Sequence, residues 1–315
     1  MTAKNELMAV DIGNSRIKFG RYERSGMSKN GPIPQPVQVN FERSAKMINL
    51  DLWLRESPVA PGTEWIVSNV NETMLTGFCD WMLVNRPDDC VKILTYHDFK
   101  IPMDVDAPEK IGLDRLCNAL AAKYLKEPGE PSLIVDIGTA VTLDMLSGDG
   151  RFRGGAIMPG FQTAAAALQS KTGQLPEIDA DDLRFPEYPA KNTVGAIEAG
   201  LFWGMVGAIR QFLAFAQEGP RSALLLLTGG DAFPVLEALL NPSVNAKSDT
   251  VIAEATRVAD PSGFSCPPVV KSGNTQFQEK LAAIPENSFV PVHQFHEAIC
   301  CPYLTLSGIA LTSVQ

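Results

Sequence analysis

The stretch AVDIGNSRIKFG at residues 9–20 runs from an apolar segment into an acid, a glycine and a hydroxyl, and then returns to apolar residues. The stretch IVDIGTAVTLDM at residues 134–145 repeats this pattern. In both, a short polar turn joins two strand-forming segments, which is typical of a β-hairpin. Asp11 and Asp136 lie 136 − 11 = 125 residues apart, about the length of one domain. The repeat therefore predicts a duplicated supersecondary unit, with one copy in each of two domains.

Composition and charge limit the class of protein. The 315 residues suffice for two domains, and 45% hydrophobic with 20% charged residues is typical of a soluble globular protein. The net charge of −9 argues against nucleic acid or an anionic membrane as the main partner, because both bind basic surfaces. The six cysteines form no C-x-x-C pair, which favours reduced thiols in a cytoplasmic protein. In the most membrane-like segment, the uncharged run Ala199–Ile209 is 11 residues long and too short to span a bilayer.

Apolar spacing and chain breakers predict alternating strands and helices in both halves of the chain. Strands are expected at 7–11, 16–22, 63–70, 91–95, 132–136, 141–146 and 223–227, and helices at 73–85, 113–125, 161–170 and 193–217. Residues from about 241 to 289 are rich in Ser, Pro, Asn and Gly, which is typical of an insertion. We therefore expect an α/β protein with domains at 1–130 and 131–315, the second of which carries the insertion.

The chemistry of the repeated turn points to phosphate. Glycine lets the backbone approach a bulky anion, exposed N–H groups form a concave anion site, and the hydroxyl of Ser15 or Thr139 adds a donor. The preceding Asp repels phosphate and so faces a cation that bridges to it. One copy alone reads as an ordinary Asx-type turn, whereas two copies at domain spacing favour a phosphate site. The motifs G-x-x-x-x-G-K-[ST] and G-x-G-x-x-G are absent, which excludes a P-loop kinase and counts against a Rossmann dehydrogenase.

Two such hairpins resemble those of the superfamily that includes actin, hexokinase, acetate and sugar kinases and the heat-shock ATPases. In that superfamily two duplicated ribonuclease-H-like (actin-like ATPase) domains hold ATP in the cleft between them. An ordered set of blocks is similar, more narrowly, to type III pantothenate kinases. The blocks are DIGNSRIK (11–18), PEKIGLDR (108–115), DIGTAVT (136–142), GGAIMPG (154–160), KNTVGAIEAG (191–200), LTGGDA (227–232) and PYLTLSGI (302–309). The resemblance implies ATP-dependent phosphorylation of pantothenate to 4'-phosphopantothenate, the first step of coenzyme A biosynthesis.

The resemblance also implies roles for particular residues. Asp114 corresponds to the proposed proton acceptor for the substrate hydroxyl; on its own it reads equally well as an acid in the first turn of a helix. Thr193 corresponds to a pantothenate contact and also reads as a helix cap. The implied pantothenate contacts are Gly112, Leu113, Asp114, Arg115 and Thr193. The implied ATP contacts are Asp11, Ile12, Gly13, Asn14, Ser15, Arg16, Ile17, Lys18, Thr139, Gly229 and Gly230.

The implied cofactors and partners follow the same resemblance. Asp136 corresponds to a ligand of a monovalent cation (K⁺ or NH₄⁺), and Asp11 would hold Mg²⁺ through water or phosphate. The family also implies a homodimer with substrate pockets near the subunit interface. Two alternatives stay open: a kinase of another small hydroxyl or carboxyl metabolite, and a non-catalytic regulatory homologue of the same fold. Val105, which stands where the family commonly has an aromatic residue, keeps both alternatives open, although the three acids argue against the second.

Overall fold

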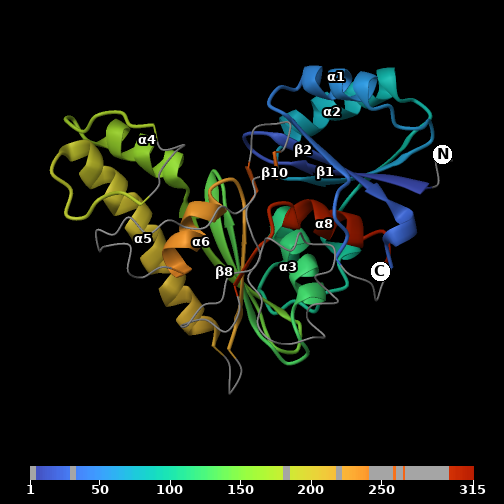
Figure 1. The fold of residues 1–315 in the computed structure, drawn as a ribbon. Coiled ribbons are helices and arrows are strands. Elements are labelled where there is room, and N and C mark those ends of the chain that lie inside the picture. Colours follow the sequence, from blue (N-terminus) through green and yellow to red (C-terminus); the bar gives the residue numbers. More distant parts are fainter. Residues whose placement is uncertain are drawn as a thin grey trace. The chain divides into compact units, whose positions relative to one another are not determined.

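The structure is a computed structural model that describes residues 5–28, 33–179, 185–217, 222–240, 258–259, 265–266 and 298–315. The described chain divides into two compact units (Figure 1), of which unit 1 contains residues 5–127 and 303–315 and unit 2 contains the described residues from 128 to 302. The sequence assigned 303–315 to the second domain, but these residues pack with unit 1. The expected insertion at 241–289 lies outside the described residues, except for the short antiparallel strands β10 (Val258–Ala259) and β11 (Ser265–Cys266).

Unit 1 is built on a five-stranded sheet in the order β3-β2-β1-β4-β5. Its strands are β1 (Glu6–Ile12), β2 (Ile17–Glu23), β3 (Gln38–Glu42), β4 (Glu64–Asn69) and β5 (Cys90–Ile93). Its helices are α1 (Ile48–Glu56), α2 (Glu72–Asn85), α3 (Leu113–Leu125) and α8 (Leu304–Leu311), with 3-10 turns at Arg24–Gly26, Tyr96–Asp98 and Pro108–Lys110. Strands β1, β2 and β3 are antiparallel, and β4 and β5 run parallel to β1.

The central strand β1 is buried on both faces of this sheet, which explains its apolar sequence. Met8, Val10 and Ile12 pack in one cluster with residues of α1 and α2. Because successive side chains point to opposite faces of a strand, Leu7, Ala9 and Asp11 lie on the other face, which is the face that α8 covers. The strand therefore carries Asp11 into the layer that contains α3 and α8.

Unit 2 repeats the strand order of unit 1. Its sheet runs β12-β9-β6-β7-β8, with β6, β7 and β8 antiparallel and with β9 and β12 parallel to β6. The strands are β6 (Ser132–Ile137), β7 (Ala140–Leu146), β8 (Phe152–Pro159), β9 (Leu224–Thr228) and β12 (Ala298–Cys300), and the helices are α4 (Phe161–Lys171), α5 (Thr193–Ala216) and α6 (Ala232–Leu240). Each strand of one sheet has a counterpart in the other, so the predicted duplication and the ribonuclease-H-like fold are confirmed.

Helix α5 is the one helix of the described residues that is long and apolar enough to cross a membrane by length and composition, with a mean hydropathy of 1.3 over 18 residues. Core helices of soluble proteins pass the same test. Phe202, Val206 and Ile209 of α5 are buried in the hydrophobic core of unit 2. One side of α5 thus packs in the core, although only 39% of the apolar window as a whole is buried.

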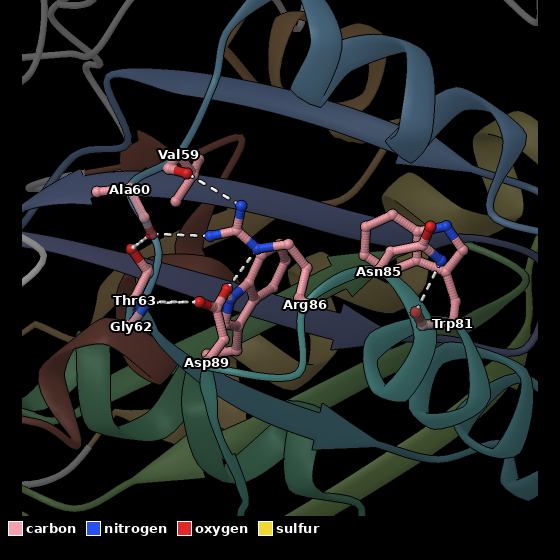
Figure 2. A network of polar contacts seen from close by, with 9 residues as sticks. Val59, Ala60, Gly62, Thr63, Trp81, Asn85, Arg86 and Asp89 are labelled. Atoms are coloured by element: carbon pink, nitrogen blue, oxygen red, sulfur yellow. Dashed lines mark hydrogen bonds and ion pairs between the residues drawn. The ribbon is translucent and has the colours of Figure 1, made fainter.

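A polar network closes the turn before β4 in unit 1 (Figure 2). The Asp89 carboxylate, whose side chain is 1% exposed, accepts hydrogen bonds from the backbone N–H groups of Gly62 (2.7 Å) and Thr63 (3.2 Å). It also accepts from Arg86 Nε at 2.6 Å, and the same guanidinium donates to the carbonyl oxygens of Val59 and Ala60 at 3.0 and 2.8 Å. One buried acid thus joins the loop before β4 to the segment that leads into β5.

We expect Asp89→Ala to lower the free energy of unfolding by about 3 kcal/mol, because it leaves Arg86 and two backbone N–H groups without their acceptor. Urea denaturation measures the change. The neighbouring exposed Asp88 supplies the control, since Asp88→Ala is expected to change stability by less than about 0.5 kcal/mol. Equal effects of the two variants would contradict a structural role for the network.

Candidate functional site

The first hairpin carries Asp11 opposite a lysine. Asp11 and Lys18 are register partners across β1 and β2, and Lys18 Nζ lies 3.1 Å from Asp11 Oδ2. The Asp11 residue is 5% exposed. The N–H of Gly13 donates to the carbonyl oxygen of Arg16 at 3.1 Å and closes a turn that leaves Ser15 exposed. The hairpin therefore presents an exposed turn beside a nearly buried acid that is already paired with a cation.

The start of α3 holds Asp114 in a defined orientation. Gly112 precedes the helix, and its carbonyl oxygen accepts the N–H of Arg115 at 3.1 Å. The Asp114 Oδ1 atom accepts from the same N–H at 2.8 Å. A methyl group on Gly112 would stand 2.5 Å from Asp114 Oδ1, so the glycine leaves room for the carboxylate. The helix dipole also stabilises negative charge in this first turn.

One buried thiol, that of Cys117, lies within electrostatic range of both of the acids that the sequence predicted for unit 1. Burial raises the pKa of the Cys117 thiol well above its usual value, and the negative charges of Asp11 and Asp114 raise that pKa further. The fully buried Ser68 is the register partner of Asp11 on β4, so it completes this cluster. The structure thus brings the hairpin of residues 11–18 and the beginning of α3 together around Cys117.

The second hairpin resembles the first but differs at two points. Asp136 of β6 has Thr142 as its register partner on β7, where the first hairpin has a lysine. Thr228 of β9 is its partner on the other side. The turn between the strands is also one residue shorter, because Gly138 donates its N–H to the carbonyl oxygen of Ala140 at 3.1 Å. Both register partners of Asp136 therefore carry hydroxyl groups, and a threonine stands across this hairpin where a lysine stands across the first.

Two glycine blocks of the sequence support this second turn. Gly229 has a φ of +97°, and a methyl group there would stand 2.2 Å from the carbonyl oxygen of Ile137. A methyl group on Gly160 would stand 1.9 Å from the carbonyl oxygen of Gly138. Gly160 also donates its N–H to the carbonyl oxygen of Thr139 at 3.0 Å. The backbones of three loops meet here at distances that no side chain would permit.

The remaining predicted residues are placed as follows. Thr139 and Gly230 are exposed, and Gly229 is half-buried, all at the same edge of the unit 2 sheet. Thr193 is the exposed first residue of α5, and Asn192 is the cap, because its side chain accepts the N–H of Gly195 at 2.8 Å. The interpretation of Thr193 as a helix cap is therefore wrong, and the reason is that the residue before it can also accept the orphan N–H.

Sequence reasoning missed several residues of these sites. Ser68 and Cys117 showed no motif, because an isolated Ser in a strand and an isolated Cys in a helix are ordinary core residues. Thr163 of α4, whose Oγ1 donates to the carbonyl oxygen of Thr139 at 2.7 Å, also carried no signal. Gly160 lies in the block GGAIMPG, and the glycines of this block could have been predicted to let two backbones approach closely. In the part of the chain that the structure describes, no group of three or more His, Cys, Asp or Glu side chains gathers as a metal cluster.

The duplicated sheets, with an acid and a glycine turn at the end of each central strand, place the chain in the class of two-domain proteins with an actin-like ATPase fold. Residues 7–214 match the family described as type III pantothenate kinase. A type III pantothenate kinase of Dehalococcoides mccartyi is 31% identical over 242 residues, which cover 75% of this chain and 88% of the relative. The chain therefore belongs to the type III pantothenate kinase family, kinases that carry out the first step of coenzyme A biosynthesis with ATP.

Two further similar proteins are a curated relative and a solved structure. A type III pantothenate kinase of Rhodopirellula baltica is 40% identical over 152 residues, which cover 47% of this chain and 54% of that relative. A solved structure described as a putative Baf family transcriptional activator from Campylobacter jejuni is 22% identical, with a TM-score of 0.44, and the match covers 76% of this chain and 89% of that one.

Proposed function

We propose that this chain transfers the γ-phosphoryl group of ATP to the primary hydroxyl of pantothenate and that Asp114 is the base. The observation that supports this best is that Asp11 and Asp114 both lie within electrostatic range of the same buried thiol, Cys117. In this scheme the hairpin faces the phosphates of ATP, and the helix presents its carboxylate to the hydroxyl of pantothenate. In this scheme Gly112, Leu113, Arg115 and Thr193 contact pantothenate.

The reaction needs little covalent chemistry from the protein. The substrate oxygen forms a bond to the γ-phosphorus, the bond from that phosphorus to the β–γ bridging oxygen breaks, and ADP leaves with the electron pair. The hydroxyl proton passes to Asp114. Because the transition state of phosphoryl transfer is loose, the base has only to orient the hydroxyl and accept its proton late. The N–H of Arg115, bonded to Asp114 Oδ1 at 2.8 Å, keeps the carboxylate oriented for this task.

The hairpin of residues 11–18 is proposed to bind ATP phosphates through its exposed turn and through Lys18. In this structure Lys18 pairs with Asp11, and phosphate oxygens compete for the same ammonium group. A single carboxylate suits Mg²⁺, which keeps several waters and takes its other ligands from phosphates, so Asp11 fits as its holder through water or phosphate. Mg²⁺, when bound, neutralises charge on the phosphate oxygens.

The oxygen-rich surroundings of Asp136 fit a monovalent cation. Its register partners Thr142 and Thr228 both carry hydroxyl groups, and hard cations take oxygen ligands. K⁺ or NH₄⁺ at this position would supply positive charge beside the unit 2 turn, where Thr139 is proposed to contact ATP. We further propose that units 1 and 2 are the two domains of the fold, with 303–315 belonging to the first, and that the enzyme works in the cytoplasm.

We expect ADP release that depends on pantothenate, measured by a coupled assay against a panel that also holds simple sugars and acetate. Asp114→Asn is expected to lower kcat by at least about a hundredfold, because the amide cannot accept the proton, while ATP binding persists. A variant within about tenfold of wild type would remove Asp114 from the role of base. ADP release with sugar or acetate alone would assign another substrate, and none with any compound would favour a regulatory protein.

Replacement of K⁺ by Na⁺ is expected to lower kcat at least about tenfold if Asp136 holds the larger ion, since a smaller cation fits the same oxygen ligands poorly. Steady-state rates at constant ionic strength measure the effect. In Asp136→Asn the difference between the two salts should largely disappear. A wild-type rate that is the same in both salts would contradict the proposed cation site.

A second copy of the chain is the proposed partner of α5. A groove of about 570 Å³ runs along this helix, with Tyr188 and Trp203 in its lining. Methyl groups on Gly200, Gly204 and Gly207 would meet nothing within 4 Å in the described chain, and their spacing places them on one helical face. An apolar helix face with so much free space is typical of an interface, and a homodimer is the assembly that the family resemblance implies.

Gly204→Glu is expected to convert a dimer into a monomer, because it places a charge in the middle of this groove. Size-exclusion chromatography with light scattering measures the mass. Gly173→Glu is the matched control, since Gly173 also stands in open space but outside the groove. A monomeric wild type, or a dimer that Gly204→Glu leaves intact, would overturn the proposed interface.

A further inference from the structure

The C-terminal helix α8 is an integral part of unit 1, although it follows the last strand of the unit 2 sheet in the chain. All eight of its residues, Leu304–Leu311, are buried. It packs against α3 and against the strands β1, β2 and β4, and Figure 1 shows it in red beside α3. A helix buried all round is a core element and not a surface addition. The layer that contains Asp11 and Asp114 is therefore completed by the end of the chain.

The first contact of α8 with the catalytic helix is between backbones. A methyl group on Gly308 would stand 2.0 Å from the carbonyl oxygen of Cys117 and 2.8 Å from its Cα. The two helices thus touch at Cys117, three residues after Asp114, and only glycine permits that approach. The contact determines how far the first turn of α3 lies from α8.

The second contact is a buried hydrogen bond one residue further along α3. The hydroxyl of Thr305 donates to Asn118 Oδ1 at 2.9 Å, and the two residues are 3% and 1% exposed. Buried hydrogen bonds of this kind favour one relative placement of two elements, because any other leaves a polar group without its partner. This hydrogen bond therefore favours one rotation of α3 about its axis and one position of α3 along α8.

The same helix also contacts the first hairpin. Leu306 Cδ1 lies 3.2 Å from the point where a methyl group on Gly20 would stand, and Gly20 is the register partner of Ala9 on β1. One rigid, buried helix thus touches the strand pair that carries Asp11 and the helix that carries Asp114. These two acids are about a hundred residues apart in the chain, so their spacing depends on packing, to which α8 contributes together with the direct contact of α3 with β4.

We propose that Thr305 and Gly308 are positioning residues for phosphoryl transfer, which hold the first turn of α3 so that Asp114 stands at the correct distance from the Asp11 hairpin. Neither residue touches substrate in this scheme; each acts through Cys117 or Asn118. The proposal rests on the proposed role of Asp114 as base. A displacement of about 1 Å at a reacting group can cost about a hundredfold in rate, so a small change in this packing is expected to be visible in kcat.

The test compares a threonine of α8 with the threonine that follows its last residue. Thr305→Val removes the hydroxyl that reaches α3, whereas Thr312→Val removes one that donates to the carbonyl oxygen of Ile309 at 2.7 Å, in the last turn of α8. We expect Thr305→Val to lower kcat at least about tenfold with KM for ATP within about twofold. Thr305→Ser, which keeps the hydroxyl, should recover most of the rate, and Thr312→Val should behave as wild type.

Measuring both kcat and the melting temperature distinguishes a positioning role from a purely structural one. Thr305→Val that melts at a lower temperature but keeps its kcat would overturn the proposal, as would equal losses of kcat in Thr305→Val and Thr312→Val. Gly308→Ala gives a second reading, since the added methyl pushes α3 away without removal of any hydrogen bond. It is expected to lower kcat in the same way.

Amide hydrogen exchange of the wild-type chain tests the packing without any variant or activity. If α8 holds α3, peptides that cover 113–118 and 304–311 should open together and exchange with similar protection. Much faster exchange of 113–118 would overturn the proposal even in an active enzyme. If instead Asp114→Asn proves fully active, the proposed role of Asp114 as base fails, while the exchange result still reports on the contact between α3 and α8.

Discussion

Unit 1 depends on the burial of β1 on both faces of its sheet. The alternation of side chains sends Met8 and Val10 into the cluster beneath α1 and α2 and turns Ala9 toward α8. Asp11 follows the same alternation near the carboxyl end of the strand, so its carboxylate emerges in the layer where α3 begins. The two-residue period of the strand thus determines both the core packing of β1 and the side on which the candidate acid lies.

Backbone contacts at glycines determine the finer geometry. Gly308 against Cys117, Gly160 against Gly138 and Gly229 against Ile137 all bring main chains closer than any Cβ would allow. Because close backbone contact has no rotamers to adjust, such junctions are stiff compared with side-chain packing. They occur beside the elements that hold the candidate acids and turns, where small displacements affect catalysis most.

The two duplicated units share one strand order but differ in the residues that surround the acid. Both sheets have the same strand order, and both central strands end in Asp-Ile-Gly. The residue opposite the acid is Lys18 in the first hairpin and Thr142 in the second, and the second turn is one residue shorter. The two acids therefore stand in different polar surroundings, one opposite an ammonium group and the other opposite a hydroxyl group. Two copies of one hairpin can thus take different roles with few substitutions.

The sequence by itself determined the two hairpins, most helices and strands, and the candidate acids, because strand period, turn residues and helix spacing are properties of neighbours in the chain. It also placed Asp114 in the first turn of α3. Only the tertiary structure decided that 303–315 join unit 1 and that Cys117 lies within electrostatic range of both Asp11 and Asp114. These facts depend on which buried faces meet across long separations, and local sequence does not encode that choice. The close approach at Gly308 exists because α8 and α3 fit each other in space.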